Sequence, residues 1–259
     1  MKIDIFVATH KKFHSPSLDS CYKVIQGGCA KYPLESDEYL RDDKGDNISL
    51  KKDNYNELTS LYWGWKNSNA DIKGLCHYRR YFIYNHKILE EKTIIKNLLN
   101  YDVIMPYPLI HLKNSNIKEL LNGPLYRQDI EIVREAIQNI FPDYLYDYEL
   151  VMQRKYACYR NMFISSDIIY NDYCEWLFTI FDYVEKKVSF SGYNEQEQRF
   201  FGFMGELLLN VWLHHSKKSV IFLDVKTLDD EINYSIKEII KRFIVKFTAN
   251  FYFNIIHRI

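Results

Sequence analysis

The stretch Asp71-Ile72-Lys73-Gly74-Leu75-Cys76-His77-Tyr78-Arg79-Arg80-Tyr81-Phe82 decides the fold prediction. Residues 72–76 predict a buried strand, which ends in a cluster of cationic and aromatic side chains. Two adjacent arginines seldom both find partners inside a protein. Ligands of open α/β sheets bind at the carboxyl ends of strands, and a guanidinium group suits a phosphate. The stretch therefore indicates a site for a phosphorylated, nucleotide-linked small molecule.

A second strand of this kind lies at the amino terminus. Residues 2–9 are rich in Ile, Val and Phe and end in Thr9-His10-Lys11. Parallel strands would bring both polar ends to one edge of a sheet, which favours ligand contact over a solvated turn. The chain has neither G-x-G-x-x-G after this strand nor G-x-x-x-x-G-K-[ST], which argues against a dinucleotide-binding fold and a P-loop NTPase.

Strands and helices are expected to alternate over the first hundred residues. Between the two strands, residues 34–53 read as a loop, and Asn54 with Glu57 has capping-box spacing for a helix. The apolar stripe of that helix is Leu58, Leu61, Tyr62 and Trp65. A helix near 88–99 and a strand over 101–105 follow. This order predicts an α/β fold with a mostly parallel sheet flanked by helices.

The rest of the chain continues the α/β pattern and then changes. Helices are predicted over 128–140, 167–186 and 196–214, and strands over 160–165 and 219–223. We assign residues 1–225 to one domain and 226–259 to a C-terminal tail. The part of the tail over 236–259 is predicted to form a basic amphipathic helix, which would either lie on an anionic membrane or pack on the domain.

Composition limits the function classes. Among 259 residues, 34 Lys and Arg balance 34 Asp and Glu, which gives no bulk electrostatic argument for nucleic-acid binding. The 22 Tyr and 16 Phe suit carbohydrate and nucleotide surfaces, but they also fill cores. Five cysteines without C-x-x-C spacing argue against disulfides and zinc. No signal peptide and no apolar run of ~18 residues is seen, so a cytoplasmic location is expected.

One helix carries a candidate catalytic carboxylate. Gln196, Arg199 and Glu206 lie at offsets of 3 and 7, which places them on one stripe of the predicted 196–214 helix. Glu206 stands in an otherwise apolar stretch. Burial there would raise its pKa and suit it as a general base, whereas pairing with a core arginine is the structural alternative.

Three strings of this sequence together resemble a known family. They are 45–49 (GDNIS) with 56–67 (NELTSLYWGWKN), 74–82 (GLCHYRRYF), and 195–206 (EQEQRFFGFMGE). They are similar to bacterial capsular and exopolysaccharide glycosyltransferases catalogued as domain of unknown function 4422. The resemblance covers residues 2–225. It implies a GT-A-like, Rossmann-like fold and a nucleotide-diphosphate-sugar donor, UDP-linked, that carries galactofuranose or galactose. It also implies a lipid-linked glycan acceptor at the inner face of the plasma membrane.

The resemblance gives the polar clusters expected roles. The donor-binding candidates are Thr9, His10, Lys11, His77, Tyr78, Arg79, Arg80 and Arg199. The sugar or acceptor contacts are Asp46, Asn47, Tyr62, Trp63 and Gln196. Glu206 is the first candidate base and Glu57 the second. An Asp-x-Asp at a strand end is not evident, so a role for Mn²⁺ or Mg²⁺ stays open. The alternative function is a non-catalytic nucleotide-sugar or glycan-binding protein.

Overall fold

The computed structural model describes residues 1–34, 36 and 38–228. Its strands are β1 (Ile3–Thr9), β2 (Tyr22–Gln26), β3 (Leu40–Arg41), β4 (Ile72–His77), β5 (Arg80–Tyr84), β6 (Lys87–Ile88), β7 (Val103–Pro106), β8 (Leu109–Ile110), β9 (Tyr156–Ala157), β10 (Phe163–Ser166) and β11 (Val220–Thr227). Nine of these described strands form one sheet in the order β3-β2-β1-β4-β10-β7-β11-β5-β6, and β8 pairs with β9. The predicted tail helix, 236–259, lies outside the described residues.

The large sheet is mixed, which corrects the expectation of a mostly parallel sheet. β3, β2, β1 and β4 run parallel to one another, and β7 is parallel to β11. β10 is antiparallel to both β4 and β7, and β5 is antiparallel to β4, β6 and β11. Antiparallel pairs are therefore in the majority among the described strands. The sequence missed this because β5 follows β4 as a hairpin, without a crossover helix.

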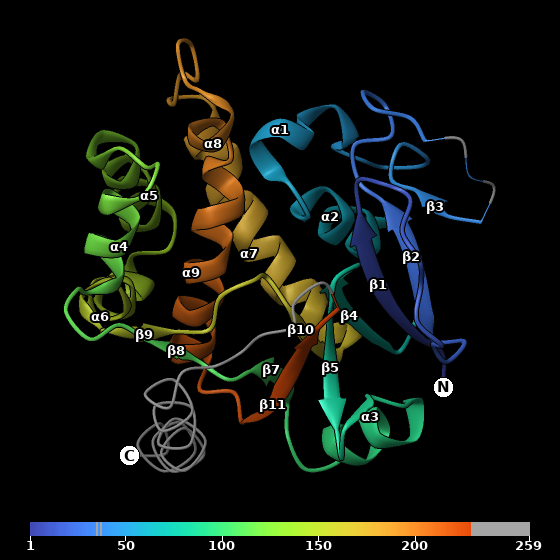
Figure 1. The fold of residues 1–259 in the computed structure, drawn as a ribbon. Helices are drawn as coiled ribbons and strands as arrows, with labels where there is room; N and C mark the ends of the chain where they lie inside the picture. The colour runs from blue at the N-terminus through green and yellow to red at the C-terminus, as the bar shows by residue number, and fades with distance from the viewer. Residues whose placement is uncertain (35, 37, 229–259) are drawn as a thin grey trace.

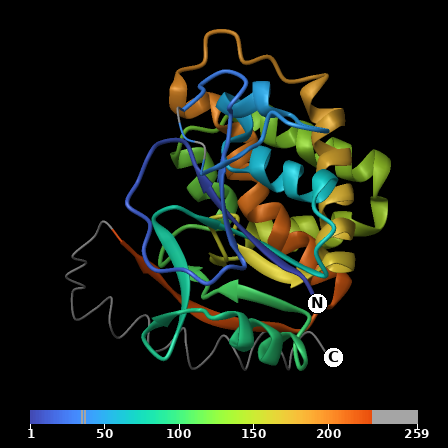
Figure 2. The same ribbon diagram turned by 90° about the vertical axis from the view of Figure 1, so that its right-hand side faces the viewer.

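Helices cover both faces of the sheet (Figure 1 and Figure 2). They are α1 (Lys52–Tyr55), α2 (Leu58–Asn67), α3 (Glu91–Leu98), α4 (Asn116–Asn122), α5 (Arg127–Ile140), α6 (Leu145–Gln153), α7 (Asp167–Glu185), α8 (Glu195–Gln198) and α9 (Phe200–Ser216). Two 3₁₀ turns, η1 (Ser49–Lys51) and η2 (Pro142–Tyr144), precede α1 and α6. α2 packs on β1 and β4, α7 packs on β4 and β10, and α3 packs on β7 and β10. Among the described residues, no helix has both the length and the apolar character that crossing a membrane requires.

β1 is buried along its whole length because it is covered on both faces. Phe6 and Ala8 belong to the core under α2 and α7, whereas Ile5 and Val7 belong to the core on the α3 side. This is the two-residue alternation of a central strand. Gly64 lets α2 approach β1, because a Cβ atom there would lie 2.5 Å from Cε2 of Phe6. The close contact fixes the position of α2 against β1.

Several predicted elements are present with shifted ends, and a few were missed. The 160–165 strand, for example, is β10 over Phe163–Ser166. β2 and β5 were not predicted. Asn54 does not cap α2, whose described N-cap residue Glu57 makes no side-chain capping hydrogen bond. The single helix expected over 196–214 is broken at Arg199 into α8 and α9. β11 extends to Thr227, past the domain boundary placed at 225.

Candidate active site

The carboxyl ends of β1 and β4 lie side by side, as the sequence predicts. Ala8 pairs with His77 in the parallel ladder, and the Tyr78 amide donates to the Ala8 carbonyl oxygen at 3.0 Å. Beyond β1, the Thr9 hydroxyl accepts a hydrogen bond from the Lys11 amide at 3.2 Å, which turns the chain. The backbone of each strand end is thereby fixed, and both ends face the same space.

The His-Tyr-Arg-Arg cluster forms a tight hairpin. His77 ends β4, Tyr78 and Arg79 make the turn, and Arg80 opens β5 and pairs with His77. His77 and Arg79 line the main cavity, whereas Tyr78 is buried and Arg80 does not line it. His77 and Arg79, two residues apart, therefore face the cavity together, and a hairpin holds them there.

Tyr78 supports the cationic side chains from behind. It is 4% exposed, and its ring centroid lies 5.4 Å from those of His10 and Phe13. The Lys11 ammonium lies 5.2 Å from the Tyr78 centroid and the Arg79 guanidinium carbon 5.4 Å from it. These are cation–π distances. Tyr78 and Lys11 lie outside the cavity lining, so their position is that of supporting residues.

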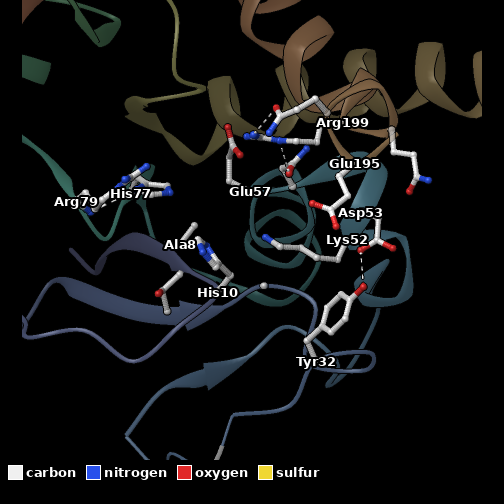
Figure 3. Close-up of a pocket in the computed structure, with 15 residues that line it drawn as sticks. Ala8, His10, Tyr32, Lys52, Asp53, Glu57, His77, Arg79, Glu195 and Arg199 are labelled. Atoms are coloured by element: carbon white, nitrogen blue, oxygen red, sulfur yellow. Dashed lines mark hydrogen bonds between the residues drawn. The ribbon is translucent and has the colours of Figure 1, made fainter. Parts of the chain in front are cut away.

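A cavity of about 750 Å³ separates these strand ends from α1, α8 and the residues between α1 and α2 (Figure 3). This volume lies within the range of small-molecule sites. The lining residues are Ala8, Thr9, His10, Gly27, Tyr32, Lys52, Asp53, Asn56, Glu57, His77, Arg79, Glu195, Gln196, Gln198 and Arg199.

Arg199 connects Asn56 and α8, which both belong to the far wall of the cavity. Asn194 and Glu197 form a capping box that starts α8. Arg199 follows α8, and its Nε donates to Asn56 Oδ1 at 3.1 Å. Its Nη1 donates to Gln196 Oε1 at 3.2 Å. Gln196 and Arg199 therefore both line the cavity, as predicted for one stripe, but the break at Arg199 leaves Glu206 out of the lining.

Basic side chains line the cavity at the strand ends and on the far wall. His10, Lys52, His77, Arg79 and Arg199 all line it. Burial, with the Arg80 and Arg79 charges, lowers the pKa of His77 to about 3. Burial and neighbouring cations, Lys52 foremost, also lower the pKa of His10. Groups whose protonation is opposed by like charges gain a favourable partner when an anion binds. The cavity is thus suited to a polyanionic ligand such as a diphosphate.

Three carboxylates line the same cavity: Asp53, Glu57 and Glu195. Asp53 is ion-paired with Lys31 and accepts a hydrogen bond from the Tyr32 hydroxyl at 3.0 Å. Glu57 Oε1 accepts one from Asn161 Nδ2 at 2.8 Å. Within residues 1–34, 36 and 38–228, no group of three or more His, Cys, Asp or Glu is arranged to hold a metal ion.

Glu206 lies on α9, close enough to Glu57 for the Glu57 charge to affect its pKa. It is partly buried, and its Oε1 accepts a hydrogen bond from the Arg160 amide at 2.8 Å. Burial and the Glu57 charge raise its pKa to about 7, which suits a general base. Arg160 and Asn161 hold the two carboxylates from adjacent positions, with φ of 86° and 50°. Left-handed backbone at two consecutive non-glycine residues is strained and is found preferentially at functional sites.

Four predicted sugar or acceptor contacts lie elsewhere. The Tyr62 hydroxyl donates to Asp46 Oδ1 at 3.1 Å, and Trp63 Nε1 donates to the Lys44 carbonyl oxygen at 2.7 Å. Asn47 Oδ1 accepts from the Ser49 amide. The first two bonds attach the 44–49 loop to α2, and the third lies within the loop. None of the four residues lines the main cavity. Tyr62 instead lines a second cavity of about 360 Å³. In the structure, side chains from these sequence strings therefore help to pack the 44–49 loop against α2.

Sequence reasoning missed eight of the residues that line the cavity, among them Lys52, Asn56 and Gly27. Lys52 and Asn56 fall within a stretch interpreted as loop and helix cap, and Gly27 follows β2, which was not predicted. A sequence signal for Gly27 existed, because the pair at 27–28 marks a turn. For Lys52 there was none, since a surface lysine and a cavity lysine look alike in one sequence.

The fold and the site together define a mixed α/β protein with a polar cavity at the carboxyl ends of two parallel strands. A family model matches residues 4–218, and the chain belongs to that family, described as Domain of unknown function (DUF4422). A solved apo structure of WbbM, a bifunctional glycosyltransferase, is similar at a TM-score of 0.83 and 27% identity. The similarity covers 89% of this chain and 46% of WbbM, so this chain spans a little under half of that protein. No curated protein matches.

Proposed function

We propose that this protein is a glycosyltransferase of bacterial surface-polysaccharide synthesis. It would transfer galactofuranose or galactose from a UDP-linked donor to a lipid-linked glycan. The observation that carries the proposal is the cavity at the ends of β1 and β4, which combines the cations Lys52, Arg79 and Arg199 with three carboxylates. The similarity to WbbM, itself described as a bifunctional glycosyltransferase, supports sugar transfer as the reaction. A GT-A-like arrangement would place the donor at these strand ends.

The proposed reaction is an inverting displacement. The acceptor hydroxyl oxygen forms a bond to the anomeric carbon of the sugar, while the bond from that carbon to the diphosphate oxygen breaks with its electron pair. Arg79 would offset the charge of the diphosphate that leaves, and His10 and His77 would donate hydrogen bonds to it. Because Glu57 lines the cavity and Glu206 does not, the hydroxyl proton would pass first to Glu57 and from it to Glu206, whose pKa is raised. Thr9 and Arg199 would hold other parts of the nucleotide.

The cations would take over the part that a divalent metal plays in donor binding. In this proposal Arg80 acts at the Glu206 side, where its charge opposes the rise in the pKa of that carboxyl. The tail over 236–259 would bring the enzyme to the inner face of the plasma membrane, where the lipid-linked acceptor lies.

The decisive experiment is a screen of nucleotide sugars by thermal shift, followed by a transfer assay with a lipid-linked acceptor. We expect a UDP-sugar to stabilise the protein and to be consumed in the presence of EDTA. Activity that EDTA abolishes and Mn²⁺ restores would contradict the metal-free mechanism. A nucleotide sugar that binds without hydrolysis or transfer would instead identify a non-catalytic binding protein.

A further inference from the structure

Lys52 reaches into the main cavity without a partner (Figure 3). Among the described residues, its ammonium group takes part in no hydrogen bond and no ion pair. The adjacent Lys51 differs, because it forms an ion pair with Glu185 beside the second cavity. Two neighbouring lysines thus have opposite surroundings, and only the one without a partner faces the proposed donor site.

Two glycines form a seat for the Lys52 side chain. A Cβ atom at Gly28 would lie 2.5 Å from Lys52 Cγ, and one at Gly27 would lie 3.0 Å from Lys52 Nζ. Gly28 also has a φ of 81°, which L side chains rarely adopt. Any larger residue at either position would displace the lysine. The backbone therefore leaves room for this stem and for this ammonium group.

A buried carboxylate fixes the glycine turn. Asp42 is fully buried and accepts hydrogen bonds from the amides of Gly28 and Cys29 at 2.7 and 3.0 Å. It also accepts from the Ser49 hydroxyl, just before α1. Asp42 thus connects the turn after β2 to the segment that carries Lys52. These three hydrogen bonds fix the turn at Gly28 relative to the segment before α1. The position of the Lys52 side chain therefore depends on contacts between separate segments of the chain.

The electrostatic surroundings of Lys52 favour an anion. Burial lowers the pKa of Lys52, and Arg199 lowers it further, whereas Glu57, Asp42 and Asp53 oppose this. His10 faces the same space from the end of β1, and Lys52 is the largest charge effect on its pKa. An ammonium group that is partly buried beside other cations, with no partner among the described residues, is costly. A bound anion would offset that cost.

We propose that Lys52, seated by Gly27 and Gly28, binds the diphosphate group of the donor. This inference rests on the proposed function, because it assigns a further residue to the same site. The ammonium group would make charge-assisted hydrogen bonds to phosphate oxygens, opposite the cations at the ends of β1 and β4.

The test is calorimetric titration with inorganic pyrophosphate and with UDP at low ionic strength. Lys52→Gln should weaken both by about 10- to 100-fold, the loss typical of a hydrogen bond to a charged group. Gly27→Ala should weaken them in the same direction by pushing the ammonium aside. Lys51→Gln is the matched control and should bind both as the wild type does. Thermal denaturation would verify that each variant is folded.

The outcomes separate this inference from the proposed function. Equal affinity of the wild type and folded Lys52→Gln would overturn the role of Lys52, while sugar transfer by the wild type would leave the proposed function standing. If the wild type bound neither ligand, both proposals would fail.

Discussion

Glu206→Gln should both impair the enzyme and stabilise it increasingly as the pH rises. The glutamine side chain would keep an oxygen that accepts the hydrogen bond from the Arg160 amide, so the geometry of the corner is retained. The variant loses the negative charge that burial and Glu57 oppose. As the proposed base, the carboxylate is needed for transfer. Its removal should therefore cut turnover by about 10²- to 10⁴-fold and leave donor affinity nearly unchanged.

The size of the stability effect follows from the pKa. The folded value is about 7, against an ordinary 4.5. Because the folded value is raised, the native state binds more protons than the unfolded state in this window, and stability is lost as pH rises from 4.5 through about 7. The full difference corresponds to about 3 kcal/mol. Glu206→Gln removes this loss, so its stability relative to the wild type should grow by about 2 to 3 kcal/mol between about pH 5 and pH 8.

Urea unfolding of both proteins across this pH range measures the effect. Glu175→Gln is the control, because Glu175 is exposed on α7 and its substitution should give no such pH-dependent gain. In the wild type, turnover should fall below about pH 7 as Glu206 becomes protonated. Parallel stability curves for the wild type and Glu206→Gln would refute the reasoning, and so would full activity of the variant.

Two further predictions concern the hairpin and the tail. Arg79→Ala should weaken UDP binding by about 10-fold or more, because Arg79 lines the cavity. Lys12→Ala is the control and should leave UDP binding unchanged, because Lys12 is exposed and lies outside the cavity. Equal UDP affinity of the wild type and Arg79→Ala in calorimetry would refute the assignment of Arg79 to the donor site. Deleting residues 236–259 should abolish co-sedimentation with anionic liposomes, and unchanged co-sedimentation would reject membrane docking through the tail.

The sequence was sufficient for one wall of the site. Residues 2–9 and 72–77 have the apolar runs of central strands, and in each case the polar residues begin where the strand ends. Strand periodicity and the rule for ligand sites in α/β sheets were enough to place Thr9, His10, His77 and Arg79 together. This prediction succeeded because parallel neighbours in a sheet share a register, which leaves little freedom to their ends.

The opposite wall could not be predicted in this way. It is built from α1 and α8, each of four residues, which are too short to leave a periodic pattern. The long apolar face of α9 hid the break at Arg199, because Phe200 and the residues after it continue the stripe. Lys52 depends on a turn more than twenty residues away in sequence, at Gly27. Such contacts are tertiary, and no local pattern encodes them.

Strained backbone conformations occur at two residues next to Glu57 in sequence or in space. Asn56, just before it, has φ 53° and ψ −126°, and Asn161, its hydrogen-bond donor, has φ 50°. Each of these asparagines also has a buried side-chain atom that finds no hydrogen-bond partner within the described part of the chain: Asn56 Nδ2 and Asn161 Oδ1.

These features each destabilise the fold by an amount on the order of 1–3 kcal/mol, and a domain does not concentrate them at random. The strained asparagines also make the hydrogen bonds that join Asn161 to Glu57 and Arg199 to Asn56. These bonds fix the far wall of the cavity relative to the strand ends. Catalysis by two carboxylates and a leaving diphosphate requires such fixed geometry. The residues whose strained conformations destabilise the fold are therefore the residues that the proposed chemistry requires to be rigid.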